Sequence, residues 1–279
     1  MRTRDEPAEI VVGDDRIRGD WVQPAGGRPG VLMVHGWGGS RSQYIASAHR
    51  VAALGCVALV IDLRGHAARA DQFETVSREQ NLQDVLAAYD ALAAHPEVDP
   101  DAIAVAGSSY GGYLAALLTT MRAVSWLALR VPALYRDEDW STPKLRLDRA
   151  LIDAYRRSPI EAARNRALAA CSAFEGDVLI VRSEHDHLVP VQVIDNYRAA
   201  FTRARSMTYR TMAGADHGLT DARWQQAYTA LMSDWLRERL AEFGERSRAN
   251  VTAAHPAEPV AGETAPEELD AATAAPGRR

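Results

Sequence analysis

Short runs that are apolar at nearly every position recur along this chain, and they alternate with longer stretches in which apolar residues repeat every three to four positions. A run with almost no polar positions suits a parallel strand that is covered on both faces of its sheet. Five runs have this character: residues 30–34, 56–61, 102–106, 124–129 and 177–181. They predict the strands of a mostly parallel sheet.

The stretches between the apolar runs predict helices. Residues 77–80, Ser-Arg-Glu-Gln, have the sequence of a capping box, and the apolar positions from Leu82 to Leu92 then mark one helix face. Residues after Asp221 show the same spacing and predict a last helix. Because strands and helices alternate, we expect an α/β protein with helices on both faces of the sheet.

Two further patterns predict strands that are more exposed. The turn residues 13–15, Gly-Asp-Asp, separate two strand-like stretches and predict a hairpin over residues 8–23. We expect this hairpin to pair antiparallel at one edge of the sheet. Residues 206–210 predict a final strand of mixed polarity.

Two segments do not fit the alternation. Residues 132–172 contain mixed charge, three prolines and a loose helical pattern but no buried-strand run, so we expect a small helical cap inserted over the sheet. Residues 244–279 are rich in Ala, Pro and Glu and poor in large aliphatic residues, which is typical of disorder. The sequence therefore predicts one domain over residues 1–243, followed by a disordered tail.

Composition narrows the classes of partner. The chain has 32 Lys+Arg against 37 Asp+Glu, a net charge of -5, and no dense basic block. We therefore expect no nucleic-acid partner and no anionic membrane partner. Two cysteines, Cys56 and Cys171, are too few for a disulfide framework in a chain of 279 residues. Oligomeric state is left open.

The first residues of the chain are followed by acids and a proline, and they lack the apolar run of a signal peptide. Residues 102–121 are uncharged, but Gly-Ser-Ser-Tyr-Gly-Gly interrupts them, which disfavours a membrane span. We expect a cytoplasmic protein.

The strongest chemical signal is Gly-Ser-Ser-Tyr-Gly at residues 107–111, which directly follows a predicted buried strand and directly precedes a helix-like run. A Gly-x-Ser-x-Gly sequence in this setting predicts a sharp turn that exposes a nucleophilic serine, Ser109. Glycines two positions on either side are needed because the turn leaves no room for side chains there.

A serine hydroxyl needs a base within hydrogen-bond reach, and the base needs a carboxylate that orients it. Asp186 lies after the fifth apolar run and His217 lies after the last predicted strand. The chain order Ser109, Asp186, His217 is the order expected of an α/β-hydrolase triad. Glu184 is the competing third member.

His185 and His187 flank Asp186 and raise the alternative of a zinc site. No HExxH sequence or comparable second cluster accompanies them, and a triad needs no metal. We therefore expect neither a metal nor any other cofactor.

The oxyanion that forms on attack needs two backbone N–H donors. Tyr110, directly after the nucleophile, is predicted to supply one. The glycine-rich residues 35–40, His-Gly-Trp-Gly-Gly-Ser, follow the first buried run and are predicted to supply the other from Trp37. Trp37, Tyr113, Tyr135 and Trp140 are predicted substrate-binding aromatics, with core packing as the alternative.

Taken together, these motifs resemble a known superfamily. The set consists of His-Gly-Trp-Gly-Gly at residues 35–39, Asp-Leu-Arg-Gly-His at 62–66, Gly-Ser-Ser-Tyr-Gly-Gly-Tyr at 107–113, Asp186 with Val-Pro at 189–190, and His-Gly at 217–218. Over about residues 30–240 it resembles the α/β-hydrolase superfamily, which implies the α/β-hydrolase fold.

The elbow is similar to those of the prolyl-oligopeptidase and dienelactone-hydrolase branches. The chain departs from both, because it has no room for a propeller domain and has Ser109 where dienelactone hydrolases use cysteine.

The sequence thus predicts a serine hydrolase that cleaves a carboxylic ester or related small acyl substrate through an acyl-enzyme on Ser109. Three alternatives remain open. A peptidase or amidase would use the same triad, and a thioesterase would need phosphate contacts such as Arg156, Arg157 and Arg164. The third is a non-catalytic binding protein on a hydrolase fold.

Overall fold

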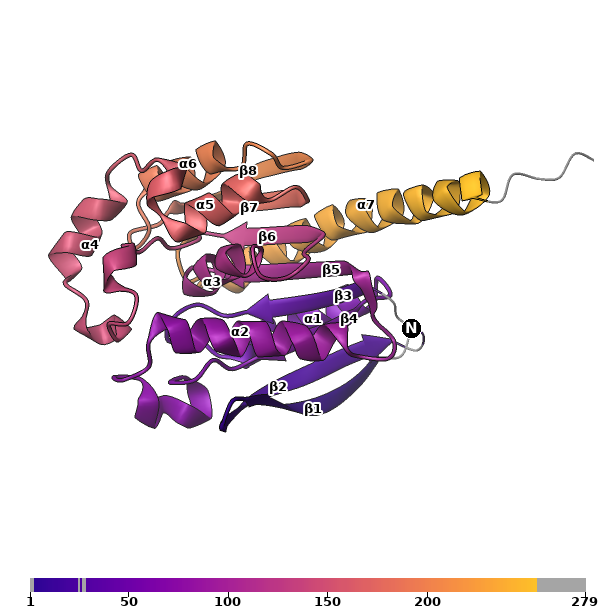
Figure 1. Cartoon of the computed structure of the whole chain (residues 1–279), viewed down its shortest axis with the longest axis horizontal. Coiled ribbons are helices and arrows are strands. Elements are labelled where there is room, and N and C mark those ends of the chain that lie inside the picture. The colour runs from indigo at the N-terminus through magenta and orange to yellow at the C-terminus, as the bar shows by residue number, and fades with distance from the viewer. Residues whose placement is uncertain (1–2, 25, 27–28, 255–279) are drawn as a thin grey trace, which may run out of the picture. The chain divides into compact units, whose positions relative to one another are not determined.

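The structure, a computed structural model, describes residues 3–24, 26 and 29–254 (Figure 1). Its centre is an eight-stranded sheet. In sheet order the strands are β1 (Thr3–Val12), β2 (Asp15–Pro24), β4 (Val57–Ile61), β3 (Pro29–Val34), β5 (Asp99–Ser108), β6 (Trp126–Arg130), β7 (Asp177–His185) and β8 (Ser206–Asp216). All neighbours from β4 to β8 are parallel. The predicted mostly parallel sheet is confirmed.

The predicted hairpin forms the antiparallel edge. Val12 pairs with Asp15 across the turn, and Gly13 adopts a φ of 60°, which glycine reaches without strain. Strand β2 in turn pairs antiparallel with β4. The opposite edge is β8, whose side chains are mostly exposed or half-buried, as its mixed polarity predicted.

Helices cover both faces of the sheet. They are α1 (Ile45–Ala52), α2 (Arg78–Ala93), α3 (Tyr110–Leu118), α4 (Arg149–Arg156), α5 (Arg166–Ala173), α6 (Val191–Ala200) and α7 (Ala222–Ala254). Buried side chains of α2, α3, α5 and α6 form one core cluster, and those of α1 and α7 form the other.

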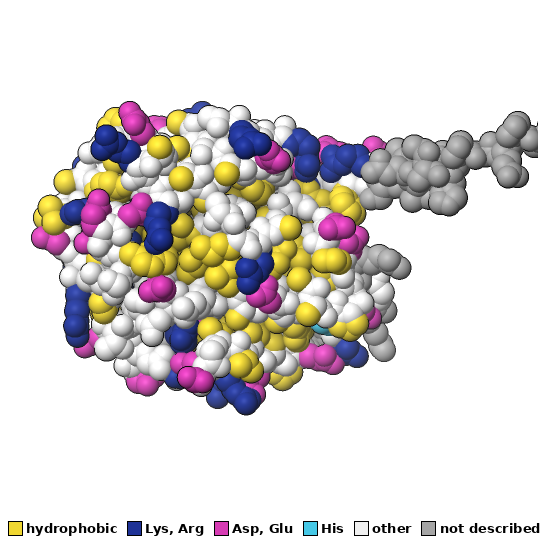
Figure 2. All heavy atoms as spheres, in the orientation of Figure 1, with side chains coloured by type: hydrophobic (Ala, Val, Ile, Leu, Met, Phe, Trp, Pro, Cys, Tyr) yellow, Lys and Arg dark blue, Asp and Glu magenta, His cyan; other side chains and the backbone are white. Residues whose placement is uncertain are grey.

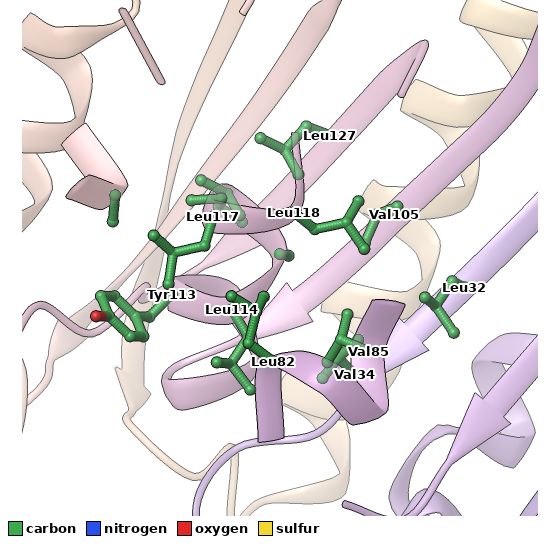
Figure 3. Packing of buried hydrophobic residues seen from close by; sticks show 14 of the residues in the cluster. Leu32, Val34, Leu82, Val85, Val105, Tyr113, Leu114, Leu117, Leu118 and Leu127 are labelled. Atoms are coloured by element: carbon green, nitrogen blue, oxygen red, sulfur yellow. The ribbon is translucent and has the colours of Figure 1, made fainter. Parts of the chain in front are cut away.

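Alternate side chains of a strand point to opposite faces of the sheet and so contribute to both clusters. Leu32 and Val34 of β3 belong to the first cluster, whereas Val31 and Met33 belong to the second. Figure 3 shows the first cluster, with strand residues packed against leucines of α3. On the outside, Figure 2 shows basic and acidic side chains interspersed, with apolar side chains exposed between them. In the described part of the chain, no helix is long and apolar enough to cross a membrane.

The segment between β6 and β7 differs from the expected cap. It contains three 3-10 turns, η3 (Asp137–Asp139), η4 (Lys144–Arg146) and η5 (Ala162–Arg164), together with α4 and α5. Helix α5 packs against α3 and α6, with Leu168 and Cys171 fully buried, so it belongs to the helical layer. The cap therefore ends before α5, earlier than the predicted residue 172, and Figure 1 shows it beyond the ends towards which the parallel strands point.

The expected start of the disordered tail is wrong. The compact unit ends at Phe243, but helix α7 runs through Ala254. Residues 244–254 include Ala, Arg and Glu, which have high intrinsic helix propensity or are compatible with a helix. The rest of the predicted tail, residues 255–279, lies outside the described residues.

A buried polar network ties α2 to the loop after β4. Asp84 is wholly buried and accepts hydrogen bonds from the backbone amide of Arg64 at 2.9 Å and from its Nε at 2.6 Å. Asn81 donates to Asp84 and to the Arg64 carbonyl, each at 3.0 Å, and accepts from the hydroxyl of Tyr110 at 3.0 Å. The network thus reaches the first residue of α3.

This network predicts a large stability difference between two similar changes on α2. Asp84→Asn leaves the buried Arg64 guanidinium without a counter-charge, so we expect the free energy of unfolding to fall by about 3 kcal/mol. Asp90→Asn, which removes the partially exposed pair with Arg122, should cost less than about 1 kcal/mol. Urea denaturation of both variants measures the difference, and equal midpoints would contradict it.

Candidate active site

The turn between β5 and α3 places Ser109 in a backbone conformation that side chains rarely adopt. Its φ is 52° and its ψ is -114°. A Cβ added to Gly111 would lie 2.3 Å from the carbonyl oxygen of Val34, and one added to Gly107 would lie 2.4 Å from that of Gly111. The glycines are therefore required sterically, as the sequence predicted.

Hydrogen bonds with the end of β6 and the loop after it hold this conformation. The amide of Ser109 donates to the carbonyl of Arg130 at 2.9 Å, and the Ser109 carbonyl accepts from Ala133 at 2.9 Å. Such constraints compensate a strained residue, whose conformation costs about 1–3 kcal/mol.

Strained backbone conformations concentrate at the carboxyl ends of the parallel strands. In the described residues, four non-glycine residues have positive φ: Ala67 (50°), Ser109 (52°), Val131 (40°) and Leu219 (51°). They lie in the segments that follow β4, β5, β6 and β8, respectively. Strain concentrated in this way is typical of functional sites.

The three residues predicted as a triad lie in hydrogen-bond contact. The Oγ of Ser109 is 3.0 Å from Nε2 of His217, and Nδ1 of His217 is 2.7 Å from Oδ2 of Asp186. The His217 ring is 17% exposed and the Asp186 carboxylate 5%. With Nδ1–H donating to the carboxylate, Nε2 is free to accept the serine proton.

Asp186 is held as a carboxylate. Burial raises its pKa, but hydrogen bonds from His217 and from the amides of Val189 and Leu188 lower it more, so the pKa lies below its usual value. The competing acid, Glu184, is exposed and accepts from the amide of Gly214 at 2.7 Å instead. The structure therefore pairs Asp186 with the histidine.

The two predicted oxyanion donors belong to segments that adjoin Ser109. Tyr110 is the first residue of α3, so its amide has no carbonyl partner inside the helix. In the loop after β3, a Cβ added to Gly36 would lie 3.4 Å from the Cβ of Ser109. Gly36 therefore lies close to the nucleophile, and Trp37 is the next residue in the chain.

Two buried histidines support these loops in their neutral form. Burial lowers the pKa of His35, whose Nδ1–H donates to Gly36 and whose Nε2 accepts from the Leu63 amide. Burial likewise lowers the pKa of His66 to about 4. The His66 ring lies edge-on to the ring of Trp37, with centroids 4.7 Å apart.

A cavity of about 550 Å³ opens in front of Ser109 and His217. Trp37 and Tyr135 line it, as predicted for substrate-binding residues, together with cap and loop side chains that include Lys144, Leu147, Ile152, Arg156, His187 and Leu188.

Two predicted substrate-binding residues do not reach this cavity. Tyr113 is fully buried, because one turn of α3 beyond Ser109 its ring faces the helical layer. Trp140 lines a separate hollow beside α2 and α3, with the guanidinium of Arg166 4.8 Å from its ring. For these two positions the packing alternative holds.

The other sequence alternatives find less support in the geometry. Of the three arginines considered for a thioesterase, Arg156 lines the cavity, whereas Arg157 pairs with Asp153 and Arg164 with Glu161 on the exposed side of the cap. In the described residues, no group of three or more His, Cys, Asp or Glu side chains is placed to hold a metal ion.

Comparison with known proteins fits this geometry. The model of the prolyl oligopeptidase family matches residues 42–242. The chain belongs to the prolyl oligopeptidase family. Membership makes it a hydrolase of the α/β-hydrolase superfamily. An uncharacterized protein of Mycobacterium tuberculosis is 29% identical over 243 residues. The alignment covers 84% of this chain and 78% of that relative.

Solved structures confirm the α/β-hydrolase fold. A dienelactone hydrolase from Anabaena variabilis aligns with a TM-score of 0.61 at 19% identity, over 85% of this chain and 99% of that one. The Pyrococcus furiosus esterase Pf2001 aligns at 0.64 and 18%, over 85% and 93%. The acylaminoacyl peptidase of Pyrococcus horikoshii aligns at 0.64 and 16%, over 84% of this chain but 41% of the peptidase.

One residue of the site was not predicted from the sequence, although it connects the strand before the nucleophile to His217. Arg130, at the end of β6, is buried; its Nη1 donates to the carbonyl of His217 at 2.8 Å and its Nε to Oγ of Ser108 at 3.1 Å. In the described residues, no carboxylate forms an ion pair with it. A charged residue that ends an otherwise apolar strand run was the available signal.

We expect Arg130 to position the histidine. Arg130→Met keeps the apolar stem but removes both donors, so labelling of the serine by a fluorophosphonate should slow about tenfold, the effect of losing one charge-assisted hydrogen bond. The second-order rate constant of labelling measures this. Arg122→Met, which removes a surface pair, is the control. Unchanged labelling in a folded Arg130→Met protein would contradict the role.

Proposed function

We propose that this protein is a serine hydrolase that cleaves carboxylic esters through an acyl-enzyme on Ser109. The observation that carries the proposal is the hydrogen-bonded series Ser109, His217, Asp186 at the base of a cavity. The same arrangement serves acyl transfer on several unrelated folds.

The mechanism follows from the donors and acceptors. Oγ of Ser109 attacks the acyl carbonyl while Nε2 of His217 takes its proton, and Asp186 stabilises the imidazolium that results. The backbone amides of Trp37 and Tyr110 hold the oxyanion. His217 then gives its proton to the leaving alcohol, which departs and leaves the acyl group on Ser109.

Water completes the cycle by the same route. His217 takes a proton from the water that attacks the acyl-enzyme, and returns it to Oγ of Ser109 as the carboxylic acid leaves. The sum is an ester plus water giving an acid plus an alcohol. These steps call on no group beyond the side chains and amides named, and Trp37 and Tyr135 contact the substrate from the cavity wall.

The extent of similarity supports ester over peptide cleavage. The chain covers 99% of the dienelactone hydrolase and 93% of the Pyrococcus furiosus esterase, but 41% of the acylaminoacyl peptidase. More than half of the peptidase's length therefore has no counterpart in this alignment, whereas the two ester-type enzymes are matched almost end to end.

Hydrolysis of nitrophenyl esters of graded acyl length tests the proposal. Ser109→Ala and His217→Ala should each lower turnover by about 10³ to 10⁶-fold, because the nucleophile and base act as a unit. Ser172→Ala is the matched control, since that hydroxyl donates only to a carbonyl of its own helix at 2.8 Å. Equal activity of wild type and Ser109→Ala would refute the nucleophile.

Two further readouts separate the alternatives. Faster hydrolysis of aminoacyl anilides than of the matched esters would favour a peptidase. Failure of a fluorophosphonate to label the wild type, together with inertness towards every ester, would favour a non-catalytic protein.

A further inference from the structure

The cavity in front of Ser109 is lined by more basic than acidic side chains. Lys144 from η4 and Arg149 and Arg156 from α4 all line it. Asp153 is the acidic residue of that lining, and its carboxylate already accepts from Nε of Arg157 at 2.9 Å. Among the residues that the structure describes, no carboxylate forms an ion pair with any of the three cations.

Lys144 stands out in both sequence and structure. It is the only lysine of the 279-residue sequence. Every other residue counted as Lys or Arg is an arginine. Its Nζ lies 4.2 Å from the centroid of the Trp37 ring, next to the predicted oxyanion loop. Burial, followed by the positive charges of Arg156 and Arg149, lowers its pKa to about 7.

The three cations in one cavity contrast with the net charge of the whole molecule, which is -5. Like charges brought together and partly removed from water repel each other, and the depressed pKa of Lys144 expresses that cost. A ligand with negative charge would remove the repulsion and supply the missing counter-charge.

Two contacts anchor Arg156 beside the site. Its Nε donates to the carbonyl of Leu134 at 2.9 Å, and its guanidinium lies 4.8 Å from the ring centroid of Tyr135. Helix α4 is thereby held against the loop after β6, so its basic side chains border the space that an acyl group or leaving group enters.

We propose that the cavity takes esters that carry an anionic oxyacid group, a carboxylate or a phosphate, on the acyl part or the leaving group, and that Lys144, Arg149 and Arg156 bind that group. This inference rests on the hydrolase function proposed above. The other titratable groups here are the buried His66, whose pKa is lowered to about 4, and His187, His217 and Asp153, which line the same cavity.

Two pairs of esters test the charge preference. The first is the 4-nitrophenyl half-ester of adipic acid and its terminal carboxamide; the second is the butyrate of 4-hydroxybenzoate and that of 4-hydroxybenzamide. Each pair has nearly the same shape and differs by one negative charge. At pH 6.5, we expect kcat/KM of the charged ester to exceed that of its carboxamide by at least about tenfold in one pair, the effect of a charge-assisted hydrogen bond.

Variants of the cap assign the preference. Lys144→Gln should lower the charged-to-uncharged ratio about tenfold. Arg164→Gln, in η5 and paired with the exposed Glu161 outside the cavity lining, should leave the ratio unchanged. Replacing the adipate carboxylate by a phosphonate distinguishes the two sources of charge, since a larger ratio for the phosphonate favours a phosphorylated substrate.

The ratio also carries a pH signature. An effect of pH that is common to both members of a pair cancels in their ratio. Lys144 is charged below a pKa of about 7 and neutral above it, so the ratio should fall as pH rises through that value. In Lys144→Arg, whose guanidinium stays charged, the ratio should remain constant from pH 6 to 8.5.

The outcomes separate this inference from the function on which it rests. Ratios near one in both pairs, or a ratio unmoved by Lys144→Gln in a folded protein, overturn the anionic substrate while hydrolysis that depends on Ser109 still stands. Absence of hydrolysis and of fluorophosphonate labelling overturns both. Should Lys144→Gln fail to fold, the pH dependence of wild type against Lys144→Arg decides.

Discussion

No side chain fits between the first turn of α3 and the carboxyl end of β3. The backbone of Gly111 lies against the carbonyl of Val34 so closely that a Cβ there would be 2.3 Å from it. Because α3 begins at this contact, the chain has a single residue, Ser109, in which to turn from β5 into the helix. The positive φ of Ser109, and the position from which its hydroxyl meets His217, follow from that contact.

Separate anchors hold the partners of Ser109 against this fixed point. On one side the buried pair of Arg64 and Asp84 reaches Tyr110 through Asn81. On the other side Arg130 ties the carbonyl of His217 to the strand beside the nucleophile. The first anchor is a compensated ion pair, whereas the second is a cation satisfied by neutral acceptors. The histidine loop is therefore held without an anion that competes with Asp186.

The sequence predicts best what neighbouring residues decide. The strand, turn and helix around Ser109 are continuous in the chain, and their steric demands appear directly as glycines. Side-chain direction depends on distant packing, which is why Tyr113 and Trp140 were placed in the cavity although the structure directs them elsewhere. Arg130 was missed for the same reason, because its partner His217 lies 87 positions away.

The end of the domain shows a further limit. Composition distinguished residues beyond Phe243 from the packed core, but a low content of large aliphatic residues does not stop a helix already formed on the core from continuing. The predicted end of the cap lies too late for a similar reason. The buried residues of α5 are mostly small and do not form the continuous apolar run that indicates a strand.

The scarcity of lysine has a practical consequence. Because Lys144 supplies the sole side-chain amine of the sequence, amine-directed reagents have one target besides the chain's α-amino group. That target borders the cavity and is partly deprotonated near neutral pH. A fluorophore or cross-linker attached there would report from the mouth of the site without engineered cysteines, while both native thiols stay buried.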